Sequence, residues 1–257
     1  MMFHRTTAVR WAMALLLSFT LPVRAATISI SPLRLELGAR HRTDIITLRN
    51  AGEAPLRVQV RVMLWTVADD GQWQLTPSKD LIVTPELIEI APAKEAQLRV
   101  GTLLDVGAGE GTYRLLLDEL PNLDSAAGSL AEVRVLTQVS MPVFVEPEQR
   151  TRLPSLSAAT VEHGTLAVSL GDSGTQRLDP QNINVSVLDK GGHVLEQRNV
   201  MANYVLPGRT WFLSMKLPMD ACVRAATVSV TWPDLAGISL THAISTDART
   251  CSGANPP

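Results

Sequence analysis

Apolar and polar residues alternate along most of the chain after its first 26 residues. This period of two is typical of β-strands with one buried face. Four segments of the first half show it most clearly: Ile45–Leu48, Leu56–Trp65, Ala96–Val100 and Val133–Met141. Turn-forming residues separate the segments, as in Asn50–Gly52 and Asp69–Gly71. Because no stretch keeps a helical period between two caps, the pattern predicts an all-β protein of the sandwich or barrel type.

A polar segment with two prolines interrupts this pattern near the middle of the chain. Glu146–Pro154 follows a strand-like segment that ends at Val145, and it has the composition of a linker. Beyond it the alternation restarts in six segments: Leu166–Leu170, Ile183–Leu188, Val194–Val200, Trp211–Leu217, Ala226–Trp232 and Leu240–Thr246. A chain of 257 residues is long enough for two domains. We expect them at residues 26–147 and 148–257.

The first strand-like segment changes its apolar face part-way along. Apolar residues occupy even positions at Ile28 and Ile30, but odd positions through Leu33–Leu37. A shift of one residue turns a strand's side chains to the other face, and the shift falls at Pro32. Proline within a strand is tolerated at an edge or a bulge. We therefore predict an edge strand that bends between two sheets, with Arg34 on the face opposite the leucines.

The N-terminus has the parts of a secretory signal peptide. Arg5 and Arg10 precede the apolar run Trp11–Leu21, and Ala25 is a suitable residue for cleavage. A membrane anchor is the alternative, but a bilayer span needs about 20 apolar residues and this run is shorter. We expect residues 1–25 to be a signal peptide that directs export. No later segment has the length and apolarity for stable membrane insertion.

Composition and charge exclude several classes of function. The chain has 23 Lys+Arg against 25 Asp+Glu, a formal net charge of −2. Removal of the expected signal peptide leaves 20 basic residues and a charge of −5. Neither balance supplies the basic field of a nucleic-acid-binding protein. The two cysteines, Cys222 and Cys251, are too few for a disulfide-built scaffold, but in an exported protein they can form one structural disulfide.

No group of residues predicts an enzyme. Gly171–Gly174 is similar to the nucleophile segment of trypsin-like proteases, but no suitable histidine segment lies upstream, and Asp-Ser-Gly is also a common turn. The histidines are scattered without the spacing of metal ligands. The sequence also lacks a glycine-rich phosphate loop. We therefore expect a protein that is not an enzyme and that needs no metal, nucleotide or other cofactor.

Five motifs in order along the chain resemble the periplasmic pilus and fimbrial assembly chaperones: Ile28–Leu37, Leu48–Gly52, Tyr113–Pro121, Pro142–Pro147 and Asn203–Gly208. The resemblance covers nearly all of the chain beyond the expected signal peptide. It implies two immunoglobulin-like β-sandwich domains in an angled, boomerang-like arrangement. The commoner pattern has asparagine at the position of Leu116 and lysine at that of Pro142. These departures point to the divergent archaic branch of the family.

The resemblance also implies a function in the periplasm. Such a chaperone binds and caps a pilus or fimbrial subunit by donor-strand complementation and delivers it to an outer-membrane usher. The lent strand supplies backbone hydrogen bonds and alternate side chains that enter pockets. The implied donor residues are Val133, Val135, Thr137, Gln138 and Val139, with Gln138 at a position that is usually glutamine. The alternation alone is equally typical of a strand that buries one face in its own core.

Arg34 matches the family's arginine that binds the C-terminal carboxylate of the subunit. A guanidinium fork suits a carboxylate, because two parallel donors meet two oxygens. On the strand pattern alone, an ordinary solvent-facing charge explains Arg34 equally well. The lysine that usually accompanies this arginine is missing at Pro142, and Arg99 is a candidate for the missing charge.

A different class of function is also compatible with two immunoglobulin-like domains. A secreted adhesion or carbohydrate-binding module would use exposed aromatic side chains to stack on sugars. The chain has four Phe, two Tyr and five Trp, which leaves few for such a surface once two cores are filled.

Overall fold

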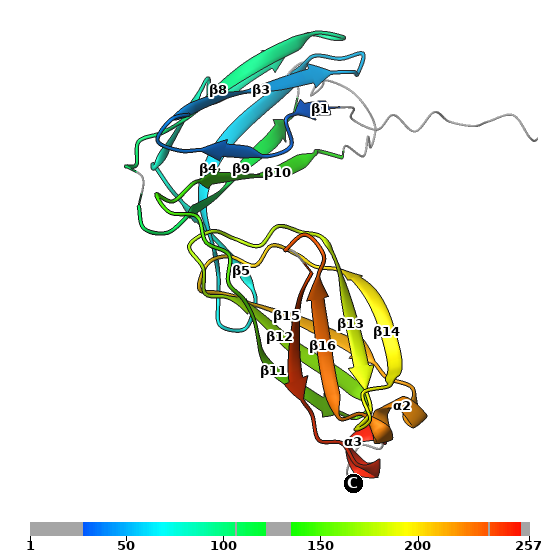
Figure 1. Ribbon diagram of the computed structural model, residues 1–257. Helices are drawn as coiled ribbons and strands as arrows, with labels where there is room; N and C mark the ends of the chain where they lie inside the picture. The colour runs from blue at the N-terminus through cyan, green and yellow to red at the C-terminus, as the bar shows by residue number, and fades with distance from the viewer. Residues whose placement is uncertain (1–27, 106, 122–134, 236, 253–257) are drawn as a thin grey trace, which may run out of the picture.

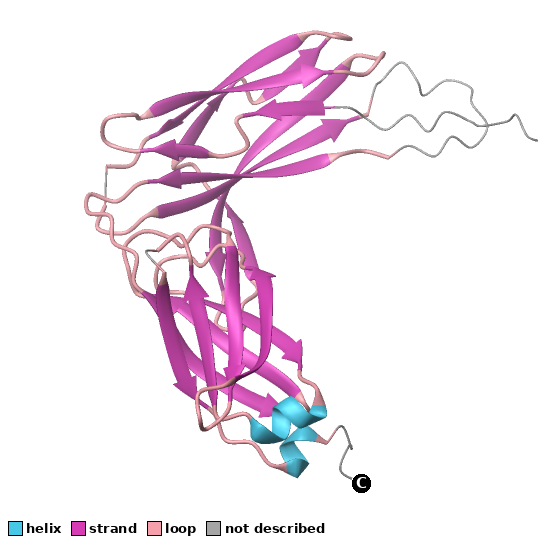
Figure 2. Cartoon of the chain, turned by 45° about the vertical axis from the view of Figure 1, so that its right-hand side comes forward, coloured by secondary structure: helices cyan, strands magenta, loops and turns pink. Residues whose placement is uncertain are grey.

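The structure is a computed structural model and describes residues 28–105, 107–121, 135–235 and 237–252. The expected signal peptide lies outside the described residues. The described chain is almost entirely β-strand and forms two sandwiches set at an angle, joined by the segment between Val145 and Pro154 (Figures 1 and 2). Each sandwich has its own apolar core. The all-β, two-sandwich fold expected from the alternation and the resemblance is confirmed.

The first sandwich consists of two sheets. One has the strand order β1-β3-β8-β6, and the other has the order β2-β10-β9-β4-β5, with β7 also paired to β4. The bounds are β1 Ile28–Ser31, β2 Leu35–Leu37, β3 Thr43–Asn50, β4 Leu56–Val67, β5 Trp73–Pro77, β6 Leu81–Thr84, β7 Leu87–Ile90, β8 Glu95–Thr102, β9 Gly111–Leu120 and β10 Gln138–Val145.

The second sandwich packs the sheet β11-β12-β15 against the sheet β14-β13-β16-β17. The bounds are β11 Pro154–Glu162, β12 Thr165–Asp172, β13 Asn182–Leu188, β14 Val194–Met201, β15 Thr210–Lys216, β16 Thr227–Trp232 and β17 Ile238–Ala243. Two short helices, α2 (Met219–Arg224) and α3 (Ala248–Cys251), cover the end far from the first sandwich (Figure 2). No helix among the described residues is long and apolar enough to cross a membrane.

The chain passes from one sheet to the other near Pro32. β1 pairs antiparallel with β3, whereas β2 pairs parallel with β10, Leu35 lying opposite Val143. The predicted bend between two sheets is therefore confirmed. Leu33 departs from the expectation, because it lies in the crossing before β2 begins and is 73% exposed, while Leu35 and Leu37 are buried.

β4 is long enough to take part in two apolar contacts. Near its start, Val58 and Val60 face the core of the first sandwich. Near its end, Trp65 on the opposite face is fully buried in a small cluster with Phe144 of β10 and Leu206 of the second sandwich. The outer face of the sheet that contains β4 thus becomes an interior surface where the two sandwiches meet.

The turn between β4 and β5 extends this contact. It reaches toward the second sandwich (Figure 1), where Arg209 Nη1 lies 3.9 Å from Asp69 Oδ1. Gly71 in this turn has φ +83°, and a Cβ atom there would lie 2.7 Å from the ring of Phe212 on β15. Glycine is therefore favoured at position 71 for two reasons: its positive φ and the close approach of the Phe212 ring.

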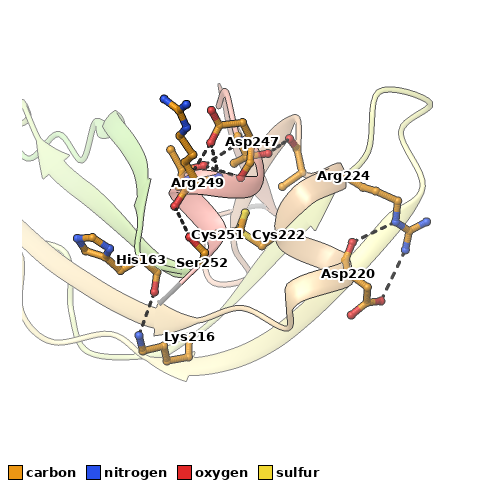
Figure 3. Close-up of a disulfide and its surroundings, with 12 residues drawn as sticks. His163, Lys216, Asp220, Cys222, Arg224, Asp247, Arg249, Cys251 and Ser252 are labelled. Atoms are coloured by element: carbon orange, nitrogen blue, oxygen red, sulfur yellow. Dashed lines mark hydrogen bonds and ion pairs between the residues drawn. A yellow bond between two sulfur atoms is a disulfide. The ribbon is translucent and has the colours of Figure 1, made fainter. Parts of the chain in front are cut away.

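The expected disulfide joins α2 to α3 at the far end of the second sandwich (Figure 3). The Cα atoms of Cys222 and Cys251 are 5.8 Å apart, and both side chains are buried. Asp247 caps α3 by accepting the backbone N–H groups of Arg249 and Thr250. The bridge and the cap together fix the last described turn of the chain to the core.

Candidate functional site

β10 is paired along its whole length on one side only. β9 pairs with all of β10, whereas β2 pairs only with Val143–Val145. The N–H of Glu119 donates to the carbonyl of Thr137 at 2.9 Å, so odd-numbered residues of this strand direct their backbone groups to β9. The backbone groups of Gln138 and Ser140 therefore point away from β9, toward the side that no described strand covers. This side is the open edge of β10.

The odd-numbered side chains of β10 face the core, and those of the residues just before β10 become progressively more exposed. Met141 is buried and Val139 is half-buried against the same core. Thr137 is also half-buried, and Val135 is 81% exposed. Val133 lies outside the described residues. One face of this segment is thus closed by the chain's own core at one end and uncovered at the other.

The side chain of Gln138 lies on the other face of the strand. Its amide donates to Asp118 Oδ1 on β9, and Asp118 Oδ2 accepts from Arg61 Nε at 2.7 Å. The hydrogen bond from Arg61, helped by that from Gln138, holds the pKa of Asp118 below its ordinary value against partial burial. These bonds fix the Gln138 side chain to the sheet while its backbone stays at the open edge.

Arg34 lies just before β2, where the first sandwich meets the second. Its Nη1 is 3.1 Å from Asp179 Oδ1 and its Nε is 3.2 Å from Glu36 Oε1. Partial burial opposes the charged form, but Asp179, Tyr204 and Glu36 raise the pKa of Arg34. The side chain is 42% exposed. Arg34 is thus accessible at the junction, and it is already paired with two carboxylates.

A buried arginine of the second sandwich binds the two sandwiches together. Arg177 is fully buried, with Nη2 2.6 Å from Glu36 Oε1, Nε 3.0 Å from Asp179 Oδ1 and Nη1 paired with Glu110. Its guanidinium carbon lies 3.5 Å from the centroid of the Phe144 ring. Burial raises the pKa of Glu110 to about 7, although Arg177 acts in the opposite direction. Since Glu36 and Glu110 belong to the first sandwich, these ion pairs hold the junction.

Arg114 is a second buried cation near the junction. It lies on β9 directly opposite Pro142 of β10, and it is 6% exposed. Its guanidinium carbon is 4.1 Å from the ring centroid of Trp65 and 4.5 Å from that of Trp73. Nη1 donates to the carbonyl of Ser140 at 3.3 Å. Desolvation lowers the pKa of Arg114, as expected for a buried cation.

Arg99 lies on the other side of the first sandwich. It is on β8, which pairs with β3 and β6 in the opposite sheet. Its neighbours Leu98 and Val100 are buried in the core, so the exposed Arg99 side chain points outward. Arg99 therefore projects from the sheet that does not contain β2 and β10. This placement does not bring it together with Arg34, and its role as a second cation stays a prediction.

The segment Gly171–Gly174 has a structural role. Asp172 Oδ1 accepts the N–H groups of Leu153 at 2.8 Å and of Gly174 at 2.9 Å. Burial raises the pKa of Asp172 above its ordinary value. These hydrogen bonds hold the segment that joins the two sandwiches, at Leu153, against the end of β12.

Comparisons with known proteins agree with these features. The family model "Pili and flagellar-assembly chaperone, PapD N-terminal domain" matches residues 27–151. The match includes all of the described first sandwich, which is therefore similar to the N-terminal domain of the pilus-assembly chaperones. A comparison with curated protein sequences gives no match.

Solved structures of pilus chaperones have a similar fold over most of the chain. A chain of the CsuC–CsuE chaperone–tip adhesion subunit pre-assembly complex of Acinetobacter baumannii is 19% identical, with a TM-score of 0.56 over 85% of this chain and 98% of that one. The class 5 fimbriae chaperone CfaA is 11% identical, with a TM-score of 0.55 over 85% and 99%. A chain of the SafA pilin–SafB chaperone complex of Salmonella enterica is 14% identical, with a TM-score of 0.54 over 86% and 97%. These likenesses support the two-domain fold of a pilus chaperone.

The two buried arginines at the junction were not foreseen. The sequence does contain a signal for Arg114. The unbroken apolar run Leu115–Leu117 indicates a strand buried on both faces, so a charged residue directly before it is expected to be buried as well. Arg177 stands in a short polar stretch and gives no such signal. Its burial depends on how the two sandwiches meet, which a local pattern does not encode.

Proposed function

We propose that this protein is a periplasmic chaperone that binds and caps pilus or fimbrial subunits by donor-strand complementation and delivers them to an outer-membrane usher. The observation that carries the proposal is the open edge of β10. Its core-facing side chains continue through Val139 and Thr137 to the exposed Val135. An unprotected edge with an apolar face pairs readily with another strand.

The proposed complex extends the large sheet of the first sandwich by one subunit strand. Its backbone would pair with Gln138 and Ser140, while Val133, Val135, Thr137 and Val139 enter the open core of the subunit. Burial of three or four such side chains supplies roughly 5–10 kcal/mol before ordering costs are subtracted. Such a complex is stable, yet the subunit can still be released to another strand during assembly.

The remaining parts of the proposal concern the cleft and the location. Arg34, exposed at the junction, would bind the C-terminal carboxylate of the subunit. The expected signal peptide, residues 1–25, would export the chain to the periplasm, where no nucleotide is needed because the energy comes from completion of the subunit fold. The departures at Leu116 and Pro142 support a place in the archaic branch.

The test is co-expression of the protein with candidate pilus subunits in the periplasm. We expect a one-to-one complex that purifies intact and a subunit that is degraded or aggregated when the chaperone is left out. A subunit that is equally stable without the chaperone, together with the failure to purify any complex, would overturn the proposal.

The adhesion or carbohydrate-binding alternative has weaker support. Among the described residues, the exposed large aromatic side chains are Trp73 and Phe212. The Trp73 ring lies tilted against Trp65 and beneath the Arg114 guanidinium, and Phe212 lies against Gly71. Both rings therefore have structural contacts within the protein.

A further inference from the structure

The pairing between β9 and β10 changes where the open edge begins. In a hydrogen-bonded antiparallel pair, each of two opposite residues donates its N–H to the carbonyl of the other. Glu119 follows this rule and donates its N–H to the Thr137 carbonyl at 2.9 Å. The Thr137 N–H instead donates to the side chain of Glu119, with Oε2 at 3.1 Å. A carboxylate thus takes the place of a backbone carbonyl at the end of the β9–β10 ladder.

This carboxylate belongs to the core-facing side of β9. Glu119 lies opposite Val58 of β4, and Leu117 precedes it on the same side of its own strand. Val58 and Leu117 are buried in the core, whereas Glu119 and Thr137 are half-buried at its end. A charged side chain on this side of a strand is costly unless it is paired or hydrogen-bonded. The Thr137 N–H supplies such a hydrogen bond.

Asp118 holds the next residue of β10 on the opposite face of the sheet. Its Oδ1 accepts from the Gln138 amide, and its Oδ2 accepts from Arg61 Nε at 2.7 Å. β10 begins at Gln138, and the preceding Val135 and Leu136 are exposed. The side chains of two consecutive acidic residues of β9 therefore contact the chain at the boundary between the paired strand and the exposed segment.

A fixed boundary matters for a strand that is to pair with another chain. A partner that pairs with a frayed strand end must first immobilise it, and the lost conformational entropy weakens binding. Alternate residues of an extended segment point the same way, so a fixed Thr137 aligns the side-chain direction of Val135 with that of Val139. A contact that fixes Thr137 therefore lowers the cost of pairing at the open edge of β10.

We propose that Glu119 is a positioning residue for strand pairing at the open edge of β10. Its carboxylate accepts the Thr137 N–H and holds the segment before β10 in the register in which Val135, Thr137 and Val139 share one face. The inference rests on the proposed function, because it names a residue that orders the proposed donor segment before a subunit binds.

The first measurement is hydrogen exchange in the free protein at the Thr137 amide. Glu119→Ala removes the acceptor, so we expect exchange at Thr137 to become about 10-fold faster, the effect of losing one hydrogen bond to a charged group. Glu119→Gln keeps a side-chain oxygen that can accept, and it should restore the protection. The amide of Val143, in the middle of the ladder, should exchange at the wild-type rate in both variants.

The second measurement is the dissociation constant for a tagged pilus subunit that the wild-type protein retains on co-expression. Glu119→Ala should bind this subunit about 10-fold more weakly at an unchanged urea midpoint, and Glu119→Gln should bind like the wild type. Glu95→Ala, at an exposed glutamate of β8 in the other sheet, is the matched control and should equal the wild type in both measurements. If Glu119→Ala does not fold, Glu119→Val replaces it, because valine favours strands and accepts no hydrogen bond.

Unchanged exchange at Thr137 in the alanine or valine variant overturns the assignment. Faster exchange with undiminished binding overturns it as well, and so does a glutamine variant that is as impaired as the alanine variant. A wild-type protein that retains no subunit refutes the proposed function and with it the role in binding. The exchange result does not depend on any subunit, so the two failures are distinguishable.

Discussion

Arg177 and Glu110 form an ion pair across the junction of the two sandwiches in which neither side chain is exposed to solvent. The pair belongs to a group that also includes Glu36 and Asp179, and it lies against the ring of Phe144. Because a buried carboxylate is costly to ionise, this contact makes the stability of the junction dependent on pH.

The free energy of unfolding should fall as the pH rises from about 4.5 to about 7. Burial raises the pKa of Glu110 from its ordinary value of 4.5 to about 7, so the unfolded chain loses this proton first. Over this range the folded state keeps a proton that the unfolded state has released, and each further rise in pH favours unfolding. Above about pH 7 Glu110 is ionised in both the folded and the unfolded state, so this group no longer lowers the free energy of unfolding as the pH rises further. The total loss in the free energy of unfolding is about 3 kcal/mol, from a pKa difference of roughly 2.5.

Urea unfolding at a series of pH values measures this dependence. Glu110→Gln, which cannot ionise, should remove this part of the slope, whereas Glu95→Gln, at an exposed glutamate of β8, should leave it unchanged. A Glu110→Gln variant with the wild-type slope would show that another group controls the stability of the junction.

Val135→Asp should abolish subunit binding without unfolding the chaperone. The Val135 side chain is 81% exposed in the free protein, so a carboxylate there is solvated. In the complex it would enter an apolar pocket, and the cost of burial should weaken binding at least about 100-fold. Co-purification with a tagged subunit measures the loss.

The neighbouring Leu136 provides the matched control. It is also exposed, but it follows Val135 in the chain and therefore points to the other face of an extended strand. Leu136→Asp should leave most of the binding intact. Equal losses for the two variants would mean that the alternation of the segment does not decide which side chains enter the subunit.

Much of the fold could be predicted from the sequence because it depends on local alternation. The bend near Pro32 follows from a change of parity within one short segment, and β1 and β2 indeed belong to different sheets. The parity pattern groups Leu33 with the buried Leu35 and Leu37, but Leu33 is exposed, because the parity rule applies only where the backbone is already in a strand. Leu33 lies in the crossing between β1 and β2, where no sheet fixes its side chain.

The candidate site was only partly predictable, because it is built from contacts between distant segments. Arg34 could be selected through the family resemblance, and the structure places it at the junction. Arg99 was selected because it is a cation in the first domain, but residue type alone does not tell which of two sheets a strand joins. Arg114 became visible only when the pairing of β9 with β10 placed it opposite Pro142.

Loss of the disulfide should destabilise the second sandwich without affecting the first. Cys222 and Cys251 are 29 residues apart in sequence, and a bridge that closes a loop of this length stabilises by about 2–4 kcal/mol. A Cys222→Ser/Cys251→Ser variant should unfold at lower urea concentration, and a reductant should lower the midpoint of the wild-type protein in the same way. The bridge lies at the end of the second sandwich remote from β10, so subunit binding by the folded variant should remain. A variant as stable as the wild type would contradict the structural role of the bridge.

Gly71→Ala should weaken the contact between the β4–β5 turn and the second sandwich. Gly71 has φ +83°, and a Cβ atom would lie 2.7 Å from the Phe212 ring, so either the ring or the turn must move. Gly192 is a matched control, because it has φ +80° and nothing within 4 Å of its Cβ position. Both alanine variants should lose about 1–2 kcal/mol to the left-handed backbone, but only Gly71→Ala should lose more. In a Phe212→Ala background the two should cost the same, and a persisting difference in urea midpoints would show that the extra loss arises within the turn itself.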